Sequence, residues 1–410
     1  MIMPHMDCIK IGLLRETKIP PDRRVALSPN MAAELLTRYP QLDIVAQPSS
    51  GRCFSDQEYI DAGIRIQEDL SDRDLLLGIK EVSIHELIFG KQYMFFAHVA
   101  KKQPYNRSLL QALLDKRITL TDYEYLTDRK GLRLIAFGRW AGIIGAYNGL
   151  RAWGLKNKLF SLKAPHALHD RMEMDEQLKA IDPGNIRILI TGGGRVAHGV
   201  LETLRKLAIP EVSPDEYLAQ PDLSPVICRL DPEHYVAPLQ NEPFSFDHFC
   251  QNPGLYRSTF NRYYPHTDLF YAAHFWDPQS PRLWLPEEMR RPDFRIRVIA
   301  DISCDINGSV PSTIRATTIA QPFYDWNPHL LCESLPFADP GNITVMSIDN
   351  LPGELPRDAS GEFGRILSER IIPCLLGQDT EHVIERATIT WNGNLTERFS
   401  YLGDFVRGIE

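Results

Sequence analysis

The stretch IRILITGGGRVAHG, residues 186–199, decides the fold that we expect for this chain. Its first five residues are mostly apolar and are typical of a buried strand. A glycine-rich turn follows directly, and residues 200–208 then show the apolar spacing of a helix. A strand, a glycine-rich turn and a helix in this order predict a dinucleotide-binding α/β unit.

The small residues of this turn suit a phosphate site. Gly192 would allow the tight turn, Gly194 would let a pyrophosphate approach bare backbone, and Ala197 or Gly199 would permit close helix packing. Unpaired N–H groups and the helix dipole would then attract the phosphates. An ordinary turn is the alternative, because glycine clusters occur there too. The predicted cofactor-binding residues of the turn are Gly192, Gly194, Arg195, Val196 and Ala197.

The acid that accepts the ribose hydroxyls, expected about 20 residues further on, is less distinct. Asp215 and Glu216 lie near that distance, but Pro210 and Pro214 interrupt the strand that would present them. No basic replacement is visible either. NAD is therefore the expected cofactor, and NADP stays open.

Composition limits the classes of protein to consider. The chain has 410 residues, 43% of them hydrophobic, which is enough for two domains of about 100–200 residues each. A net charge of -8 makes nucleic acid an unexpected partner. No apolar run approaches the ~20 residues that cross a bilayer, and residues 1–7 lack signal-peptide features. We expect a cytoplasmic protein with small-molecule substrates, which could form an oligomer.

The seven cysteines are scattered and predict reduced thiols. They form no CxxC pair and have no matching histidine spacing, so no metal site is expected. Cys304 could be a nucleophile, but its apolar surroundings and the neighbouring Asp305 favour a structural role.

Hydrophobic periodicity divides the chain. Short strand candidates at 9–14, 43–46, 75–78, 93–97 and 118–120 predict one α/β unit over residues 1–140. The glycine-rich and aromatic segment 136–155 predicts a buried helix that links two domains. Residues 210–265 show neither period cleanly, apart from a short strand candidate at 226–229, and are interpreted as an insertion with partial structure. A turn at 349–352 precedes a helix over 356–367.

Charged side chains end two of these apolar stretches, where α/β folds build active sites. Lys80 ends LLLGIK, and His98 ends YMFFAH. Taken singly, such residues are more often a solvated strand end or a satisfied core group. Together they suit amine dehydrogenation, which needs a base for the nitrogen proton, a group for the attacking water and a cation for a carboxylate.

Six motifs then carry a resemblance, which covers most of the chain outside the insertion. In order and spacing they are similar to the NAD-dependent, lysine-forming saccharopine dehydrogenases, within the wider alanine dehydrogenase and transhydrogenase N-domain family. They are RETKIPPDRRVALSP (15–29), GIKEV (78–82), FAHVAKKQ (96–103), LTDYEYL followed by GLRLIAFGRWAG (120–142), ISCDING (302–308) and SIDNLPGELPRDAS (347–360).

The resemblance implies two Rossmann-like α/β domains with parallel sheets and an active-site cleft between them. Residues 1–140 with 350–410 would form the substrate and catalytic domain, and residues 141–349 the dinucleotide-binding domain. Lys80 and His98 would be the acid–base pair, and Asp305 would lie near the nicotinamide. The implied substrate-binding residues are Arg24, Lys101, Glu81, Glu124 and Arg133.

The implied reaction converts saccharopine, NAD and water into lysine, 2-oxoglutarate and NADH. This chain departs from the pattern at Leu132, where a second arginine is expected before Arg133, and at Asn350, where a histidine is expected. One carboxylate contact is therefore in doubt. The alternatives are an alanine or other amino acid dehydrogenase, a non-catalytic nucleotide-sensing module and, more weakly, the nucleotide-binding subunit of a transhydrogenase.

Overall fold

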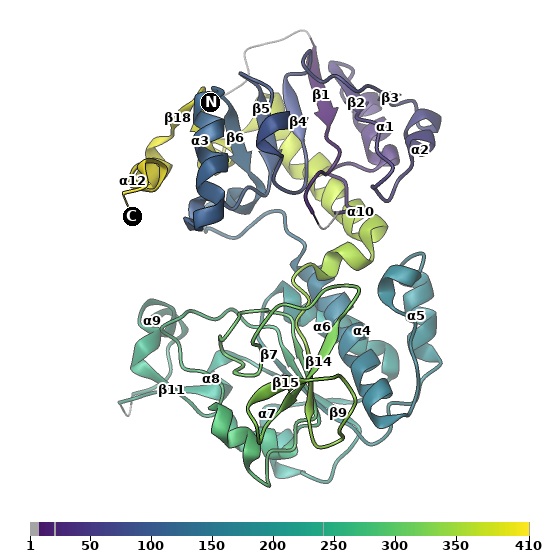
Figure 1. Cartoon of the computed structure of the whole chain (residues 1–410), viewed down its shortest axis with the longest axis vertical. Helices are drawn as coiled ribbons and strands as arrows, with labels where there is room; N and C mark the ends of the chain where they lie inside the picture. The colour runs from purple at the N-terminus through teal and green to yellow at the C-terminus, as the bar shows by residue number, and fades with distance from the viewer. Residues whose placement is uncertain (1–7, 20–21, 241, 410) are drawn as a thin grey trace. The chain divides into compact units, whose positions relative to one another are not determined.

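The computed structural model describes residues 8–19, 22–240 and 242–409 and contains two compact units. One unit comprises the chain up to Phe137 together with the chain from Pro356 onward, and the other comprises Gly138–Leu355. Each unit is built on an eight-stranded, mostly parallel sheet with helices on it (Figure 1). This architecture confirms the predicted class of two Rossmann-like α/β domains.

The sheet of the first unit has the strand order β18-β17-β6-β5-β4-β1-β2-β3. All pairs are parallel except β17 with β6 and β18 with β17, so the C-terminal part of the chain completes the sheet at one edge. The strands are β1 (Ile9–Leu13), β2 (Leu42–Ala46), β3 (Arg65–Ile66), β4 (Leu75–Leu77), β5 (Gln92–Phe95), β6 (Thr119–Asp122), β17 (Thr388–Trp391) and β18 (Asn394–Leu395).

Alternate residues of this sheet enter two different cores. Leu75 and Leu77 pack in a cluster with Phe363, whereas Leu76 packs in a cluster with Leu110. Both faces are therefore covered, which explains the uninterrupted apolar strands. The helices of the unit are α1 (Pro29–Arg38), α2 (Asp56–Asp61), α3 (Arg107–Asp115), α10 (Pro356–Ile366), α11 (Val383–Ala387) and α12 (Gly403–Arg407).

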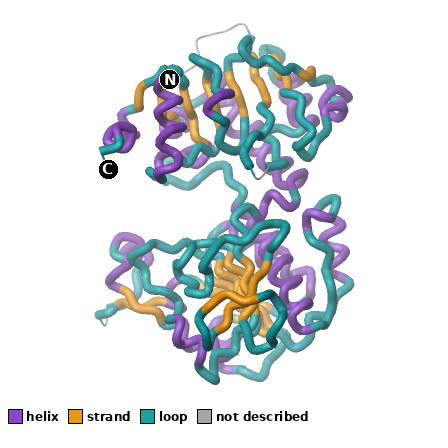
Figure 2. The backbone as a smooth tube through the Cα atoms, in the orientation of Figure 1, coloured by secondary structure: helices purple, strands orange, loops and turns teal. Residues whose placement is uncertain are grey.

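The sheet of the second unit has the order β15-β14-β16-β13-β12-β7-β9-β8, and its strands lie together in the middle of the unit (Figure 2). Only β14 and β15 run antiparallel to their neighbours. The strands are β7 (Arg187–Thr191), β8 (Glu211–Val212), β9 (Val226–Leu230), β12 (Leu269–Ala272), β13 (Val298–Asp301), β14 (Phe323–Asn327), β15 (Cys332–Ser334) and β16 (Ile343–Met346).

Glycine allows two helices of this unit to pack closely. The predicted buried helix is α4 (Gly138–Asn157), and it lies against α6 (Arg195–Leu204). A Cβ on Gly142 would come within 1.9 Å of the carbonyl oxygen of Val196, and one on Gly199 within 2.2 Å of that of Arg139. No larger residue fits either position without moving backbone. The helix α6 starts five residues earlier than predicted, directly after Gly194.

Residues 210–265 contain more regular secondary structure than the sequence predicts. They contain β8, α7 (Pro214–Ala219) and β9, and β9 pairs with β7 along its whole length. A second pair of strands, β10 (Val236–Pro238) and β11 (Tyr256–Ser258), packs through aromatic side chains onto the sheet, together with the short helices α8 (Pro232–Tyr235) and α9 (Phe246–Gln251). The interpretation of this whole segment as an insertion was therefore wrong, because β8 and β9 belong to the main sheet. The strand candidate at 226–229 is β9, whereas β8 was missed between Pro210 and Pro214.

The remaining helix of the second unit is α5 (Arg171–Lys179). No helix in the described part of the chain is both long enough and apolar enough to cross a membrane. All seven cysteines are free thiols.

Candidate functional site

Four parallel strands of the first sheet end at the same edge, and an ionisable residue lies at or shortly after the end of each. Two of these residues are the candidate acid–base pair. Glu16 lies shortly after β1, Lys80 after β4 and His98 after β5, while β6 ends at Asp122. Ligands of open α/β sheets bind at the carboxyl ends of strands. The structure therefore brings Lys80 and His98 to an edge that can form a site.

Lys80 is half-buried, and its ammonium group has no hydrogen bond or ion pair with any described residue. The backbone that carries it is fixed by Glu16, whose carboxylate accepts from the N–H of Ile79 (2.6 Å) and of Lys80 (2.9 Å). Burial, together with the charge of Arg24, lowers the pKa of Lys80 below its usual value. Lys80 therefore gives up its proton more readily than an exposed lysine.

Glu81 holds His98 in place. One carboxylate oxygen of Glu81 lies 2.9 Å from Nδ1 of His98, and the other accepts from Nζ of Lys18 at 2.6 Å. Burial alone would raise the pKa of Glu81, but these two contacts outweigh it and lower the pKa to about 2. The backbone of His98 adopts a left-handed conformation, with φ of 55°. A permanently charged Glu81 thus orients the imidazole.

Arg24 is buried beside Asp22. Its Nε and Nη2 donate to the two oxygens of the Asp22 carboxylate at 3.0 and 2.6 Å, and its guanidinium lies 4.2 Å from the centre of the Phe137 ring. Burial raises the pKa of Asp22, but the charge and hydrogen bonds of Arg24 outweigh it, so that the pKa is about 2. The pair stays ionised at neutral pH.

Glu124 brings two more predicted residues together. One of its carboxylate oxygens contacts Nη2 of Arg133 and lies 3.2 Å from Nζ of Lys101. Both cations have side chains that are about half exposed, at 49% and 45%. The other oxygen of Glu124 is buried and accepts no hydrogen bond from the residues that the structure describes. Two cations around one acid leave a net positive charge that suits a carboxylate ligand.

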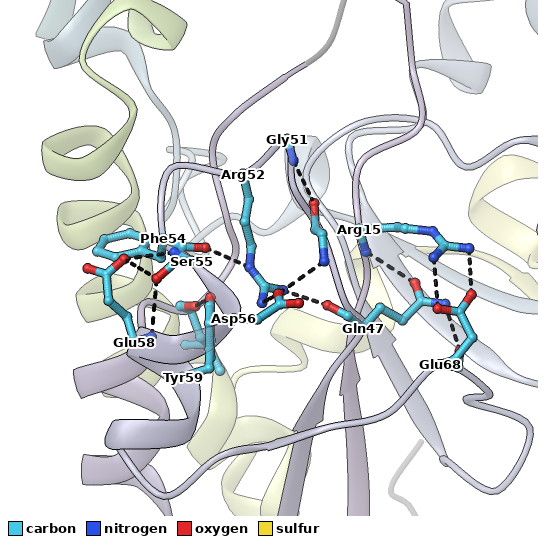
Figure 3. A network of polar contacts seen from close by, with 12 residues as sticks. Arg15, Gln47, Gly51, Arg52, Phe54, Ser55, Asp56, Glu58, Tyr59 and Glu68 are labelled. Atoms are coloured by element: carbon cyan, nitrogen blue, oxygen red, sulfur yellow. Dashed lines mark hydrogen bonds and ion pairs between the residues drawn. The ribbon is translucent and has the colours of Figure 1, made fainter.

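A polar network stiffens the loop after β2 that supports Arg24 (Figure 3). Arg52 is buried in this network, and the next residue, Cys53, donates its N–H to the carbonyl of Arg23 at 2.8 Å. The acceptors of the Arg52 guanidinium are the carbonyls of Gln47 and Phe54 and the carboxylate of Asp56. Sequence patterns do not identify Arg52, because its role depends on contacts across a turn.

Two carboxyl groups at this edge titrate near neutral pH. Burial raises the pKa of Glu16 to about 7 and that of Asp122 to about 6, although both accept backbone hydrogen bonds that lower it. Asp122 accepts from the N–H groups of Ala97 and His98 at 3.1 and 3.2 Å. These carboxyls support the backbone beneath Lys80 and His98.

In the second unit, the glycine-rich turn joins β7 to α6 as the sequence predicts. Gly192 has φ of 108°, and a Cβ on it would come within 2.5 Å of the carbonyl oxygen of Ala273. A Cβ on Gly194 would meet nothing within 4 Å. The backbone at Gly194 therefore faces open space, as a phosphate-binding turn requires. The first helical residues are Arg195, Val196 and Ala197.

Asp231, which sequence patterns missed, lies at the end of β9 beside this turn. Its Oδ1 lies 2.6 Å from the position that a Cβ on Gly193 would take. Both of its oxygens accept from Arg229, at 2.5 and 2.8 Å, and Arg229 also donates to the carbonyl of Gly192. An acid at the end of the strand next to β7 has the place of the ribose-binding acid. The strand candidate at 226–229 followed by Asp231 is the signal that could have found it.

The two acids considered from the sequence lie elsewhere. Asp215 and Glu216 belong to the first turn of α7, and Glu216 forms a capping box with Ser213. Neither is at a strand end. The spacing rule placed the acid too early, because β8 and α7 lengthen the connection to β9.

Asp305 follows β13 and is partly buried, which raises its pKa. The neighbouring Asp301 is fully buried and accepts from the hydroxyls of Ser303 and Thr313, each at 2.6 Å. Burial raises the pKa of Asp301 to about 6 despite these bonds. The hydrogen bonds of Asp301 thus fix the start of the loop that carries Asp305. Over residues 8–19, 22–240 and 242–409, no group of three His, Cys, Asp or Glu side chains could hold a metal ion.

Comparison with known proteins adds to this geometry. Residues 12–144 match the family model of the alanine dehydrogenase/PNT N-terminal domain. The chain is 30% identical over 409 residues to the mitochondrial alpha-aminoadipic semialdehyde synthase of Rattus norvegicus, with 88% of this chain and 44% of that protein covered. It thus spans less than half the length of this relative. It is 27% identical over 404 residues to the saccharopine dehydrogenase (NAD(+), L-lysine-forming) of Yarrowia lipolytica, with 92% and 95% covered.

Solved structures show the same fold. An L-alanine dehydrogenase aligns with a TM-score of 0.65 at 17% identity, covering 97% of this chain and 100% of that one. The transhydrogenase from Sinorhizobium meliloti aligns with a TM-score of 0.59 at 15% identity, covering 94% and 100%. The chain is therefore similar over residues 12–144 to the alanine dehydrogenase/PNT N-terminal domain and over most of its length to a lysine-forming saccharopine dehydrogenase, and it has the fold of an L-alanine dehydrogenase.

Proposed function

We propose that this chain is an NAD-dependent oxidoreductase of the CH–NH group that converts saccharopine, NAD and water into lysine, 2-oxoglutarate and NADH. The observation that carries the proposal is Lys80, a half-buried amine of lowered pKa without a partner among the described residues, at the sheet edge that also holds the Glu81–His98 pair. The relationship to saccharopine dehydrogenases supports this substrate.

Lys80 and His98 divide the proton transfers. Lys80 takes the proton from the substrate nitrogen, which its lowered pKa favours. Nδ1 of His98 donates to Glu81, so Nε2 accepts a proton from the water that adds to the imine carbon. Lys80 then returns a proton to the nitrogen of the leaving amine. When bound, the nicotinamide supplies the hydride acceptor.

Cations hold the substrate carboxylates. Arg133 and Lys101 both contact one carboxylate oxygen of Glu124, and their side chains are about half exposed, so a carboxylate ligand can reach both cations. Arg24 and Asp22 add a fixed ion pair whose guanidinium lowers the pKa of Lys80. The substrate nitrogen and its carboxylates would thus meet a base and a set of donors.

The residues of the turn fit a dinucleotide, and Asp231 favours NAD. Gly194 offers open backbone at the start of α6, where pyrophosphate binds helix N-termini. The carboxylate of Asp231 accepts hydroxyl hydrogens and repels a 2′-phosphate. Asp305 would face the nicotinamide.

A location in the cytoplasm and assembly into an oligomer also stay predictions.

A second candidate is an alanine or other amino acid dehydrogenase. One observation favours it, because Leu132 is 63% exposed next to Arg133, where a second cation is expected for a dicarboxylate. An amino acid with a single carboxylate would not need that cation.

The test is an assay of NADH oxidation at neutral pH with lysine plus 2-oxoglutarate. We expect turnover with this pair, and slower turnover when NADPH replaces NADH. Turnover only with pyruvate and ammonium would replace the proposal by the second candidate. Binding of NADH without turnover on any amine and oxo acid pair would contradict an enzyme and favour a sensing module.

A further inference from the structure

Phe275 is the most exposed large apolar side chain among the described residues, at 89%. It lies shortly after the end of β12, at the carboxyl edge of the second sheet. Single apolar side chains are common on protein surfaces, so exposure alone indicates no function. The place of Phe275 does, because open α/β sheets bind their ligands at this edge.

The residues on either side of Phe275 are packed against the protein. His274 is buried, and its Nδ1 lies 2.6 Å from the hydroxyl oxygen of Thr191, the last residue of β7. Trp276 packs on the loop after β13, where a Cβ on Gly308 would come within 3.2 Å of the indole ring. The backbone of Phe275 is therefore fixed between the ends of β7 and β13, and its ring is not exposed because of a loose loop.

Four neighbouring strand ends carry the parts of the proposed cofactor site. In the order β9, β7, β12 and β13, these parallel strands are followed by Asp231, the glycine-rich turn, Phe275 and Asp305. Adjacent strands lie about 4.8 Å apart, so the ends of β7 and β13 are separated by roughly 10 Å, with β12 between them. A dinucleotide with its pyrophosphate at the turn and its nicotinamide near Asp305 must therefore pass the end of β12.

The nicotinamide half of the cofactor suits an aromatic contact at this place. Its ring is planar and, in the reduced form, uncharged, and such rings pack well on aromatic side chains. Ile306, which is 44% exposed in the loop of Asp305, adds apolar surface on the same side of the turn. The adenosine half would lie on the other side, toward Asp231 at the end of β9. Phe275 should thus meet only the nicotinamide half.

We infer that Phe275 is a contact residue for the nicotinamide ring, against which its aromatic ring packs. The inference rests on the proposed function and adds to it the residue that holds the reacting end of the cofactor. ADP-ribose lacks only the nicotinamide ring, so it should not gain from this contact.

The test compares NADH with ADP-ribose in the full-length chain. Phe275→Ala removes the ring at an exposed position, so the fold should be kept, which an unchanged Tm verifies. We expect the Kd for NADH, from fluorescence titration, to rise about 10-fold, because stacking on an aromatic side chain contributes about that factor. The Kd for ADP-ribose, from competition with NADH, should stay within twofold.

Two further variants are the controls. Phe275→Tyr keeps an aromatic ring and should hold the Kd for NADH within twofold of the wild type. Phe246→Ala removes another exposed phenylalanine of the same unit, at the start of α9 and 57% exposed, and should change neither Kd.

Equal rises of both Kd values in Phe275→Ala, or no rise in either, overturn the contact. Turnover of lysine and 2-oxoglutarate together with an unchanged Kd for NADH in this variant overturns the contact alone. A Kd for NADH that depends on Phe275 in a chain without turnover on any amine and oxo acid pair overturns the proposed function and keeps the contact. Absence of NADH binding by the wild type overturns both.

Discussion

The chemistry proposed for Lys80 depends on its partial burial and its neighbours. Because its ammonium has no partner among the described residues, Lys80→Met breaks no contact that holds the fold. We expect kcat for lysine and 2-oxoglutarate to fall ~10²-fold or more, since a positioned acid or base contributes about that factor. Steady-state kinetics, together with the Kd for NADH from fluorescence titration, measures the effect.

The matched control is Lys130→Met, which removes an exposed lysine of the same unit. It should leave kcat and the Kd for NADH unchanged. If Lys80→Met retains kcat within a few-fold of the wild type, Lys80 is not the base. If it weakens NADH binding as much as it lowers kcat, the substitution has disturbed more than proton transfer.

Glu16 links the backbone beneath Lys80 to pH. Its pKa rises from the usual 4.5 to about 7 in the folded chain. Between these values the folded state holds a proton that the unfolded state has lost, so the free energy of unfolding falls as the pH rises through this window. The full shift corresponds to about 3 kcal/mol. Glu16→Gln, which cannot ionise, should lack this contribution.

Urea unfolding at pH 5 and pH 8 checks the expectation. Relative to Glu16→Gln, the wild type should lose up to about 3 kcal/mol of unfolding free energy between the two values. Parallel pH dependence in both proteins would show that Glu16 is ionised throughout this window.

Residues at strand ends could be predicted from the sequence, whereas those that depend on tertiary contacts could not. Lys80 and His98 stand directly after apolar runs, so strand periodicity alone suggests them. Asp231 escaped because a fixed spacing does not anticipate the extra elements β8 and α7.

At the scale of elements, the packing of α4 on α6 depends on glycine. A Cβ at position 142 would lie 1.9 Å from a backbone oxygen, which cannot move without displacing α6. We expect Gly142→Ala to lower the free energy of unfolding by about 3 kcal/mol, the upper range for an overpacked core. Gly361→Ala, in α10 with nothing within 4 Å, is the control and should not destabilise. Equal effects of the two substitutions in thermal unfolding would contradict close packing as the cause.

The glycine-rich turn allows a test of binding without loss of folding. Gly194 has ordinary negative φ and open space around it, so Gly194→Ala should leave Tm unchanged. The added methyl group would stand where pyrophosphate approaches the backbone, and the Kd for NADH should rise at least 10-fold. Fluorescence titration measures this Kd. Unchanged binding would place the dinucleotide elsewhere.

The elements with a clean period were predicted well. The strand β7 and its glycine-rich turn agree with the sequence pattern, and a helix follows the turn as predicted. The start of α6 was missed, because Gly194 and Arg195 do not resemble an ordinary helix N-terminus. Residues 210–265 were misjudged, since strands as short as β8 carry no measurable period.

At the scale of the whole molecule, the second unit is a single continuous segment, Gly138–Leu355, with its own core. We expect this segment to fold alone, because a compact unit with its own core and few crossing connections is independent. Circular dichroism should show cooperative thermal unfolding, and NADH should raise its Tm. Non-cooperative melting would show that its stability depends on the rest of the chain.

The return of the chain to its first sheet has a consequence for synthesis. The core under β1 and β4 includes Phe363 and Leu367, and the strand beside β6 is β17. A ribosome releases these segments only after the complete second unit has emerged. The N-terminal part of the nascent chain therefore keeps an uncovered apolar face until these segments emerge, while the second unit, which is made later, can fold first. During this interval the exposed apolar face is most prone to aggregation, which chaperones prevent.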